Sequence, residues 1–520
     1  MKFKNALYKI VVALLAIAAG SVFVTSLLTT IYYDMHEDVD FPHYAKENIP
    51  LLLLFMTIVF VAFILLHNRD FFKRRSRGLL VFALVFCAAY CLMLILSIKP
   101  LPVTDSMTLD KILDEFEHGD YSNLTEKWGY LYIWPFQLGY VFFGEIIDHI
   151  FGHGNYLAWD IILLISILVT VFFLYKITWE IFADRAVCGI MALMSLGMLF
   201  LYNYSTFVYG DIYSLLPQTI ALYTTILFVK RKKLVYALLT AVGIAVSVII
   251  KTNSEITLIA IVMILILSAW KKRGEENYYT YEFMHRLVIR ILVSAFIIFT
   301  VFVGKNAINS YYCDRAGIAA VPKGSPSVSH IAMGIQEFEL ENGWYSGYNY
   351  QTFIDNGYDT EKAKEVALAD IRERVDTFVH HPGYAFKFFF RKFLTQWADP
   401  VCISTHNLDL VSRHVENPTD LMYYIVFGDG NIIISQIMNV FMSVCYLCVF
   451  VYLVSVLRKR DVSEQEMLLL ILIFGGICFH EFWEGSSRYT MRYYVYWMPY
   501  AACGMKMILD FVGSRSKRSK

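Results

Sequence analysis

The sequence predicts an all-α polytopic membrane protein with about twelve transmembrane helices. Of its 520 residues, 57% are hydrophobic and only 17% are charged, which is not the composition of a soluble globular domain. The apolar residues gather in runs close to the roughly 20 residues that a helix needs to span a bilayer. These runs are 10–32, 49–67, 78–98, 156–177, 186–202, 212–230, 234–250, 256–270, 286–304, 433–456, 465–482 and 493–512.

The basic residues predict the orientation of the spans. Lys and Arg are enriched in the cytoplasmic loops of membrane proteins. With twelve spans, every basic cluster falls on the same side of the membrane as both termini. The clusters lie at 69–77, 230–233, 271–273, 458–460 and 515–520. We therefore expect the N- and C-termini to be cytoplasmic.

The polar segments divide the chain into three parts. Residues 1–304 form an N-terminal membrane bundle that carries a long outer loop at 99–155, residues 305–432 form a small outer-side domain of α-rich or mixed structure, and residues 433–520 form the last helices and a basic tail. Segments 134–151 and 384–397 mix apolar and charged residues, which predicts helices lying on the outer membrane surface. For 384–397, a packing helix of the outer domain is the alternative.

Ionisable residues stand at the outer ends of several runs. Lys and Arg neutralise phosphate, and an aspartate accepts a proton from a hydroxyl, so their convergence favours an acid–base reaction on an anionic lipid headgroup. The alternatives are snorkelling side chains and helix caps and, for Asp105, a solvated loop acid. The candidates are Asp105 after the third run, Lys251 after the seventh, Glu255 opening the eighth, and Glu484, Arg488 and Arg492 between the last two.

Aromatic residues are dense on the predicted outer side. Tyr132, Trp134 and Trp344 are candidates for stacking against a sugar, although interfacial belts of Trp and Tyr are common in membrane proteins. The sequence has no Walker loop, no GxGxxG loop and no HExxH helix, which argues against an ATP-driven protein or a zinc protease. We expect a membrane-lipid partner and no nucleic acid.

Several blocks then point to a family. Segment 104–124 (TDSMTLDKILDEFEHGDYSNL) is followed by 129–143 (GYLYIWPFQLGYVFF), by a lysine at a span end (Lys251), and by Ser-Arg-Tyr at 487–489 before the last span. This arrangement resembles the GT-C superfamily of membrane glycosyltransferases, in particular the family 39-like group with protein O-mannosyltransferases and the lipid A aminoarabinose transferase. Two features depart from that group: Ser106 replaces an acidic residue, and two extra spans precede the loop.

The resemblance implies inverting transfer of a sugar from a polyprenyl phosphate to a cell-wall polymer, glycan, lipid or protein, on the extracytoplasmic face of the plasma membrane. In that reaction Asp105 is the general base, and Lys251 and Arg488, with Arg391, hold the phosphate. No cofactor is expected, and since no second acid adjoins Asp105, no metal site is predicted. The alternative function is a lipid or polysaccharide transporter or flippase, which would favour polar or broken helices at mid-membrane depth.

Overall fold

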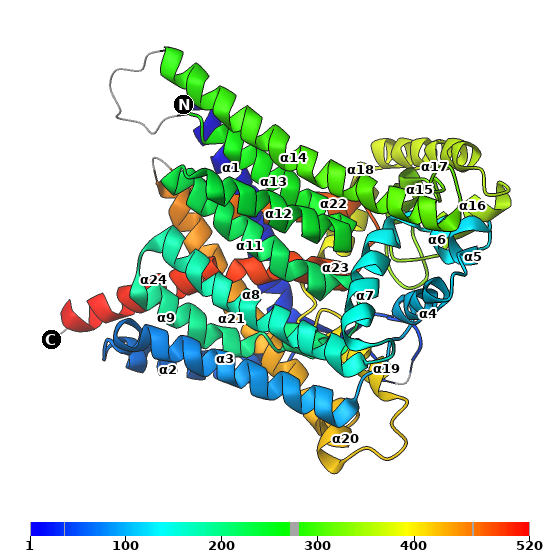
Figure 1. The fold of residues 1–520 in the computed structure, drawn as a ribbon. Helices are drawn as coiled ribbons and strands as arrows, with labels where there is room; N and C mark the ends of the chain where they lie inside the picture. Colours follow the sequence, from blue (N-terminus) through cyan, green and yellow to red (C-terminus); the bar gives the residue numbers. More distant parts are fainter. Residues whose placement is uncertain (1, 36, 271–279, 460–461, 519–520) are drawn as a thin grey trace.

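The computed structural model is built almost entirely of α-helices. It describes residues 2–35, 37–270, 280–459 and 462–518, and within these ranges the only strands form one hairpin. Helix α1 (Lys2–Leu28) leads into β1 (Thr29–Tyr32), which pairs antiparallel with β2 (His43–Lys46), and α2 (Ile49–His67) follows. The predicted all-α class is confirmed (Figure 1).

The other elements follow in chain order. In the first half they are α3 (Phe71–Ile98), α4 (Asp105–Glu117), α5 (Ser122–Thr125), α6 (Tyr130–Ile133), η1 (Pro135–Gln137), α7 (Leu138–Phe151), α8 (Tyr156–Phe182), α9 (Arg185–Met194), η2 (Ser195–Gly197), α10 (Leu199–Asn203), η3 (Tyr204–Thr206), α11 (Gly210–Arg231), α12 (Leu234–Ile250), η4 (Thr252–Ser254) and α13 (Glu255–Leu267). In the second half they are α14 (Thr280–Ala316), α15 (Ser327–Gly334), α16 (Tyr348–Asp355), α17 (Thr360–His380), α18 (Pro382–Trp397), α19 (Ser404–Ser412), α20 (Asp420–Val426), α21 (Asp429–Arg458), α22 (Glu464–Phe482), α23 (Ser487–Tyr494), η5 (Val495–Trp497) and α24 (Met498–Arg518).

Eight helices of the described chain are long and apolar enough to cross a membrane: α1, α2, α3, α8, α11, α14, α21 and α22. A ninth crossing arises if the α9 and α10 segments, bent by 54° at their break, count as one. The twelve expected spans are not confirmed. The runs at 234–250 and 256–270 fold as α12 and α13, with only 17 and 13 residues, and the run at 493–512 is divided among α23, η5 and α24.

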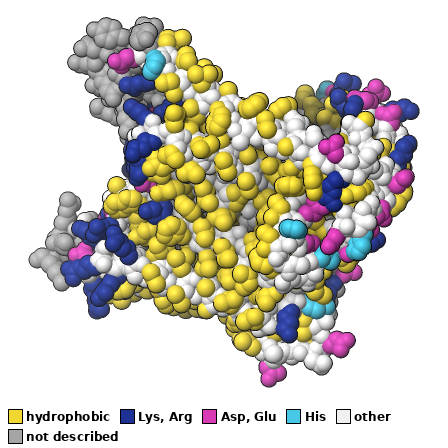
Figure 2. Space-filling view, viewed as in Figure 1, with side chains coloured by type: hydrophobic (Ala, Val, Ile, Leu, Met, Phe, Trp, Pro, Cys, Tyr) yellow, Lys and Arg dark blue, Asp and Glu magenta, His cyan; other side chains and the backbone are white. Residues whose placement is uncertain are grey.

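The two ends of the molecule differ in chemistry. The turns between α2 and α3 and between α11 and α12, which carry the basic clusters 69–77 and 230–233, lie at one end together with the C-terminal part of α24 (Figure 1). Figure 2 shows Lys and Arg gathered at that end and a broad hydrophobic surface between it and the other end, as expected of a multi-pass membrane protein. The cluster 271–273 and parts of 458–460 and 515–520 lie outside the described residues.

The opposite end is formed by α4–α7 and α15–α20 (Figure 1). Helix α14 runs unbroken through residue 304, and α21 begins before residue 433, so both expected domain boundaries fall inside helices. The segment 384–397 lies in α18, which packs one face on α22 and α23 and exposes Phe386 and Phe390 on another. The 134–151 segment forms η1 and α7.

Candidate functional site

A cavity of about 800 Å³ opens at this second end of the molecule. Its wall comes from the start of α4, the η1 turn, the segment before α11, the α12–α13 junction, residues 38–40 of the loop between β1 and β2, α14–α16, α19 and the α22–α23 connection. It brings together most of the residues singled out in the sequence: Asp105, Trp134, Lys251, Glu255, Trp344, Glu484 and Arg488. These residues are separated by up to 383 positions in the sequence, so only the tertiary structure unites them.

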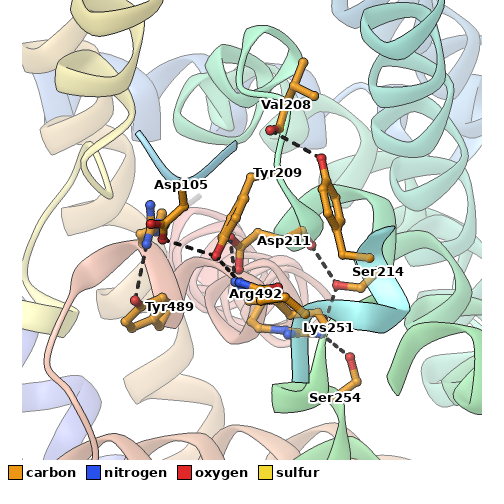
Figure 3. A network of polar contacts seen from close by, with 12 residues as sticks. Asp105, Val208, Tyr209, Asp211, Ser214, Lys251, Ser254, Tyr489 and Arg492 are labelled. Atoms are coloured by element: carbon orange, nitrogen blue, oxygen red, sulfur yellow. Dashed lines mark hydrogen bonds and ion pairs between the residues drawn. The ribbon is translucent and has the colours of Figure 1, made fainter. Parts of the chain in front are cut away.

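Asp105 is the first residue of α4, and its exposed carboxylate lines the cavity. The Tyr209 hydroxyl points to it at 3.5 Å from Oδ2 (Figure 3). Gln137 Nε2 donates to the Tyr209 oxygen at 2.7 Å. Ser106 is buried, and its hydroxyl donates to the Val103 carbonyl at 2.7 Å and accepts from the Val103 N–H at 3.0 Å. The residue beside Asp105 therefore fixes the turn into α4, and Asp105 alone of the pair faces the cavity.

Lys251 stands at the break between α12 and α13, where its extended backbone (φ −146°) ends the first helix. Its Nζ lies 3.3 Å from Asp211 Oδ2 and 4.1 Å from the centre of the Tyr209 ring (Figure 3). Gly210 permits this approach of α11, because a Cβ there would lie 3.0 Å from the Ile250 carbonyl oxygen. A second aromatic ring, Tyr489, lies 5.8 Å from the same Nζ, so Lys251 is a nearly buried cation held by one carboxylate and two aromatic rings.

Arg488 is the second cation of the cavity. Its guanidinium lies over Tyr209 at 5.4 Å and over Tyr489 at 5.1 Å, and its Nη2 donates to the Tyr489 hydroxyl oxygen at 3.2 Å. Among the described residues, its Nε has no hydrogen-bond partner and no carboxylate forms a salt bridge with its guanidinium. Two cations that both contact the Tyr209 ring, one of them without a salt-bridge partner in the described chain, make a site for an anion.

Two buried polar residues place Arg488. Lys392 Nζ donates to the carbonyls of Gly334 at 2.5 Å and Trp483 at 2.6 Å, which fixes the connection between α22 and α23. Asp399 accepts hydrogen bonds from the Ser487 hydroxyl at 2.5 Å, from Tyr33 at 3.0 Å and from two backbone N–H groups. A fully satisfied buried carboxylate of this kind holds its partners rigidly, so the residue before Arg488 is fixed to the outer part of the chain.

Glu484 adds a carboxyl group whose charge changes near neutral pH. Burial raises its pKa to about 7, while the hydrogen bond from the Tyr489 hydroxyl at 2.8 Å and the Arg488 charge favour the ionised form. Because the folded-state pKa lies above the ordinary value, the folded protein retains this proton longer than the unfolded chain. The contribution of Glu484 to the stability of the folded protein is present at low pH and is lost as pH rises through about 7.

The same titration should control anion binding. Ionised Glu484 puts a negative charge beside Arg488, so we expect affinity for a lipid phosphodiester, whose own charge is constant near neutrality, to fall as pH rises through about 7. Glu484→Gln should flatten the profile, as measured by equilibrium binding of a radiolabelled phosphodiester lipid between about pH 6 and 8. An unchanged slope in the variant would contradict the assignment.

Three candidate residues lie outside the cavity wall. Arg391 is 62% exposed and pairs with Glu341 at 2.7 Å. Tyr132 packs beside a small cluster of Ile133, Phe353 and Ala363. Arg492 is buried beneath the site, where its Nη2 donates to Gln218, Ser254 and Ser214 (Figure 3).

Arg492 contacts the α12–α13 junction, because Ser254 belongs to the turn that follows Lys251. It therefore supports the position of Lys251. Glu255 lines the cavity but is paired with Lys305 at 2.9 Å, and both side chains are about half exposed. Glu255 and Lys305 therefore lie at the rim of the cavity.

Sequence reasoning missed Tyr209, Asp211 and Tyr489. The YGD triplet at 209–211 opens α11, and an acid at the start of an apolar run needs a cationic partner, which was the available signal. Tyr489 was visible only as part of the Ser-Arg-Tyr element.

Within the described chain, one group brings three potential metal-ligating atoms within 4.8 Å of one another: Asp34, Glu37 and His43. None of the three lines the cavity. No family model matches the sequence, and no curated protein matches it. The site must therefore be interpreted from its own chemistry and from the sequence resemblance.

Proposed function

We propose that this protein is an integral membrane glycosyltransferase that moves a sugar from a polyprenyl-phosphate donor to an acceptor hydroxyl. It acts on the extracytoplasmic face of the plasma membrane, with both termini cytoplasmic and with the short helices α12, α13 and α24 completing as many as twelve crossings. The acceptor is a cell-wall polymer, a glycan, a lipid or a protein. The basic clusters at the end opposite the cavity support this orientation.

In the proposed reaction the acceptor oxygen attacks the anomeric carbon of the donor sugar. The bond between that carbon and the phosphate oxygen breaks, and the phosphate leaves with the electron pair. Asp105 takes the acceptor proton, and Lys251 and Arg488 stabilise the charge that develops on the leaving phosphate. Attack from the face opposite the leaving group inverts the anomeric configuration.

The observation that carries the proposal is the grouping of Asp105, Lys251 and Arg488 around Tyr209. The Tyr209 hydroxyl is 3.5 Å from the Asp105 carboxylate, while its ring lies 4.1 Å from Lys251 Nζ and 5.4 Å from the Arg488 guanidinium. A single aromatic side chain, Tyr209, therefore contacts both the acid–base group and the pair of cations. A sugar phosphate bound in this cavity would be oriented between a base and an anion site, which favours transfer.

The proposal is tested by sugar transfer from a panel of radiolabelled polyprenyl-phosphate sugars, with purified full-length protein and membrane extract as the acceptor source. We expect one donor to lose its sugar at a rate well above that of a detergent-only control. Donor movement between leaflets of proteoliposomes without cleavage of the sugar–phosphate bond would overturn the proposal in favour of a flippase.

A further inference from the structure

A separate part of the cavity wall carries polar groups that phosphate binding and proton transfer do not use. It is formed by Asp40 in the 33–42 loop, by Trp344, and by His406 and Asn407 on α19. Trp344, His406 and Asn407 are only 1%, 2% and 5% exposed. These buried side chains are therefore a fixed part of the cavity wall.

Two of these buried side chains have nitrogens without a hydrogen-bond partner among the described residues: His406 Nδ1 and Asn407 Nδ2. The Trp344 side chain is directed to the Asp40 carboxyl group and favours its ionised form. Buried polar groups are nearly always hydrogen-bonded, so the two unpaired nitrogens require an explanation. Both side chains line the cavity, so a hydroxyl-bearing molecule bound there would offer them hydrogen-bond partners.

Contacts of Tyr33, Asp38 and Tyr44, which flank Asp40 in the sequence, hold this part of the chain in place. Tyr33 donates to Asp399 at 3.0 Å, Tyr44 donates to Glu341 at 2.7 Å, and Asp38 pairs with Arg413 at 2.5 Å. The last contact ties the loop to α19, since Arg413 also pairs with Asp409 at 2.6 Å. Asp40 is therefore presented to the cavity by a loop anchored on both sides, which is the condition for a specific binding site.

The negative charge of Asp40 distinguishes this part of the wall from the anion site. Asp40 interacts electrostatically with Arg488 and His406, and burial raises the pKa of its carboxyl. An acid at this position disfavours a second phosphate. Asp, Asn and His beside a Trp are instead groups that accept and donate hydrogen bonds to hydroxyls and cover an apolar ring face.

We propose that Asp40, Trp344, His406 and Asn407 form a subsite for a hydroxyl-rich sugar ring, which belongs to the donor or to the acceptor of the proposed transfer. The inference rests on the proposed function and adds one residue of the N-terminal hairpin region, Asp40, which precedes the segment that resembles GT-C enzymes. Asp40 and Asn407 act as specificity-determining residues that read sugar hydroxyls.

The test compares ligands with and without a sugar on purified full-length protein. Asp40→Asn and Asn407→Leu are measured for binding of radiolabelled undecaprenyl phosphate, of its sugar-bearing forms, and, by saturation-transfer NMR, of methyl glycosides. Glu37→Gln is the matched control, because it removes a charge from the same loop at an exposed position outside the cavity wall. Monodisperse elution establishes that each variant is folded. Asp40→Asn preserves the shape of the side chain, so it still tests the subsite if Asn407→Leu does not fold.

We expect binding of sugar-bearing ligands to fall about tenfold or more in each variant, as the loss of hydrogen bonds to a ligand predicts. Undecaprenyl phosphate binding should be unchanged in Asn407→Leu and not weakened in Asp40→Asn, since Asp40 interacts electrostatically with Arg488. Loss confined to the polyprenyl-phosphate sugars assigns the ring to the donor, and loss confined to methyl glycosides assigns it to the acceptor. Variants that match Glu37→Gln with every ligand would overturn the subsite. If the wild type binds glycosides but no polyprenyl phosphate, the proposed function fails and the subsite stands.

Discussion

Asp105→Asn is expected to lower sugar transfer by about 10²–10⁴-fold, because removal of a general base typically costs that much in rate. The amide has nearly the shape of the carboxylate and can still accept a hydrogen bond from Tyr209, whose hydroxyl lies 3.5 Å from Oδ2. Donor affinity should therefore change little while turnover collapses. The measurement is single-turnover transfer from a saturating radiolabelled donor, with donor binding determined in parallel.

Asp114→Asn is the matched control for this variant. Asp114 lies on the same helix, α4, but its side chain is exposed and lies 3.6 Å from His118, outside the cavity wall. The Asp114→Asn variant removes the same charge from the same end of the molecule. Equal turnover in Asp105→Asn and Asp114→Asn would remove Asp105 from the mechanism and leave the anion site standing.

Arg488→Gln is expected to weaken donor binding by about 10–100-fold, since hydrogen bonds to charged groups contribute about 1.5–3 kcal/mol. The effect should be large because Arg488 forms no salt bridge within the described chain, so its charge is available to a phosphate. The measurement is equilibrium binding of a radiolabelled polyprenyl-phosphate sugar. Lys127→Met, which removes an exposed cation outside the cavity wall, should have no effect.

Lys251 requires a different design, because it is the salt-bridge partner of buried Asp211. Lys251→Met alone would leave a buried carboxylate unpaired, which typically costs about 3–5 kcal/mol of stability. The double variant Lys251→Met with Asp211→Asn removes both charges. We expect it to recover folding, seen as monodisperse elution, without recovering donor affinity; wild-type affinity in the double variant would exclude Lys251 from phosphate binding.

The sequence by itself determined the helical class, the positions of most apolar helices and the distribution of basic clusters. Residues 49–67 fold as α2 with the expected bounds, and Lys251 ends α12 as the break in its apolar run indicates. Hydrophobic runs and charge clusters are local properties, because a helix that faces lipid must satisfy its own backbone and be apolar along its length.

Only the tertiary structure decided which polar residues meet. It brought Asp105, Lys251 and Arg488 to Tyr209, placed Arg391 outside the cavity, and buried Arg492 beneath it. It also brought Asp40 and Asn407, 367 positions apart, into one wall. The lengths of the shorter helices were likewise a tertiary matter, since helices such as α13 are stabilised by neighbours such as α22 rather than by their own length. Contacts between distant segments depend on packing of the whole bundle, and no local pattern encodes them.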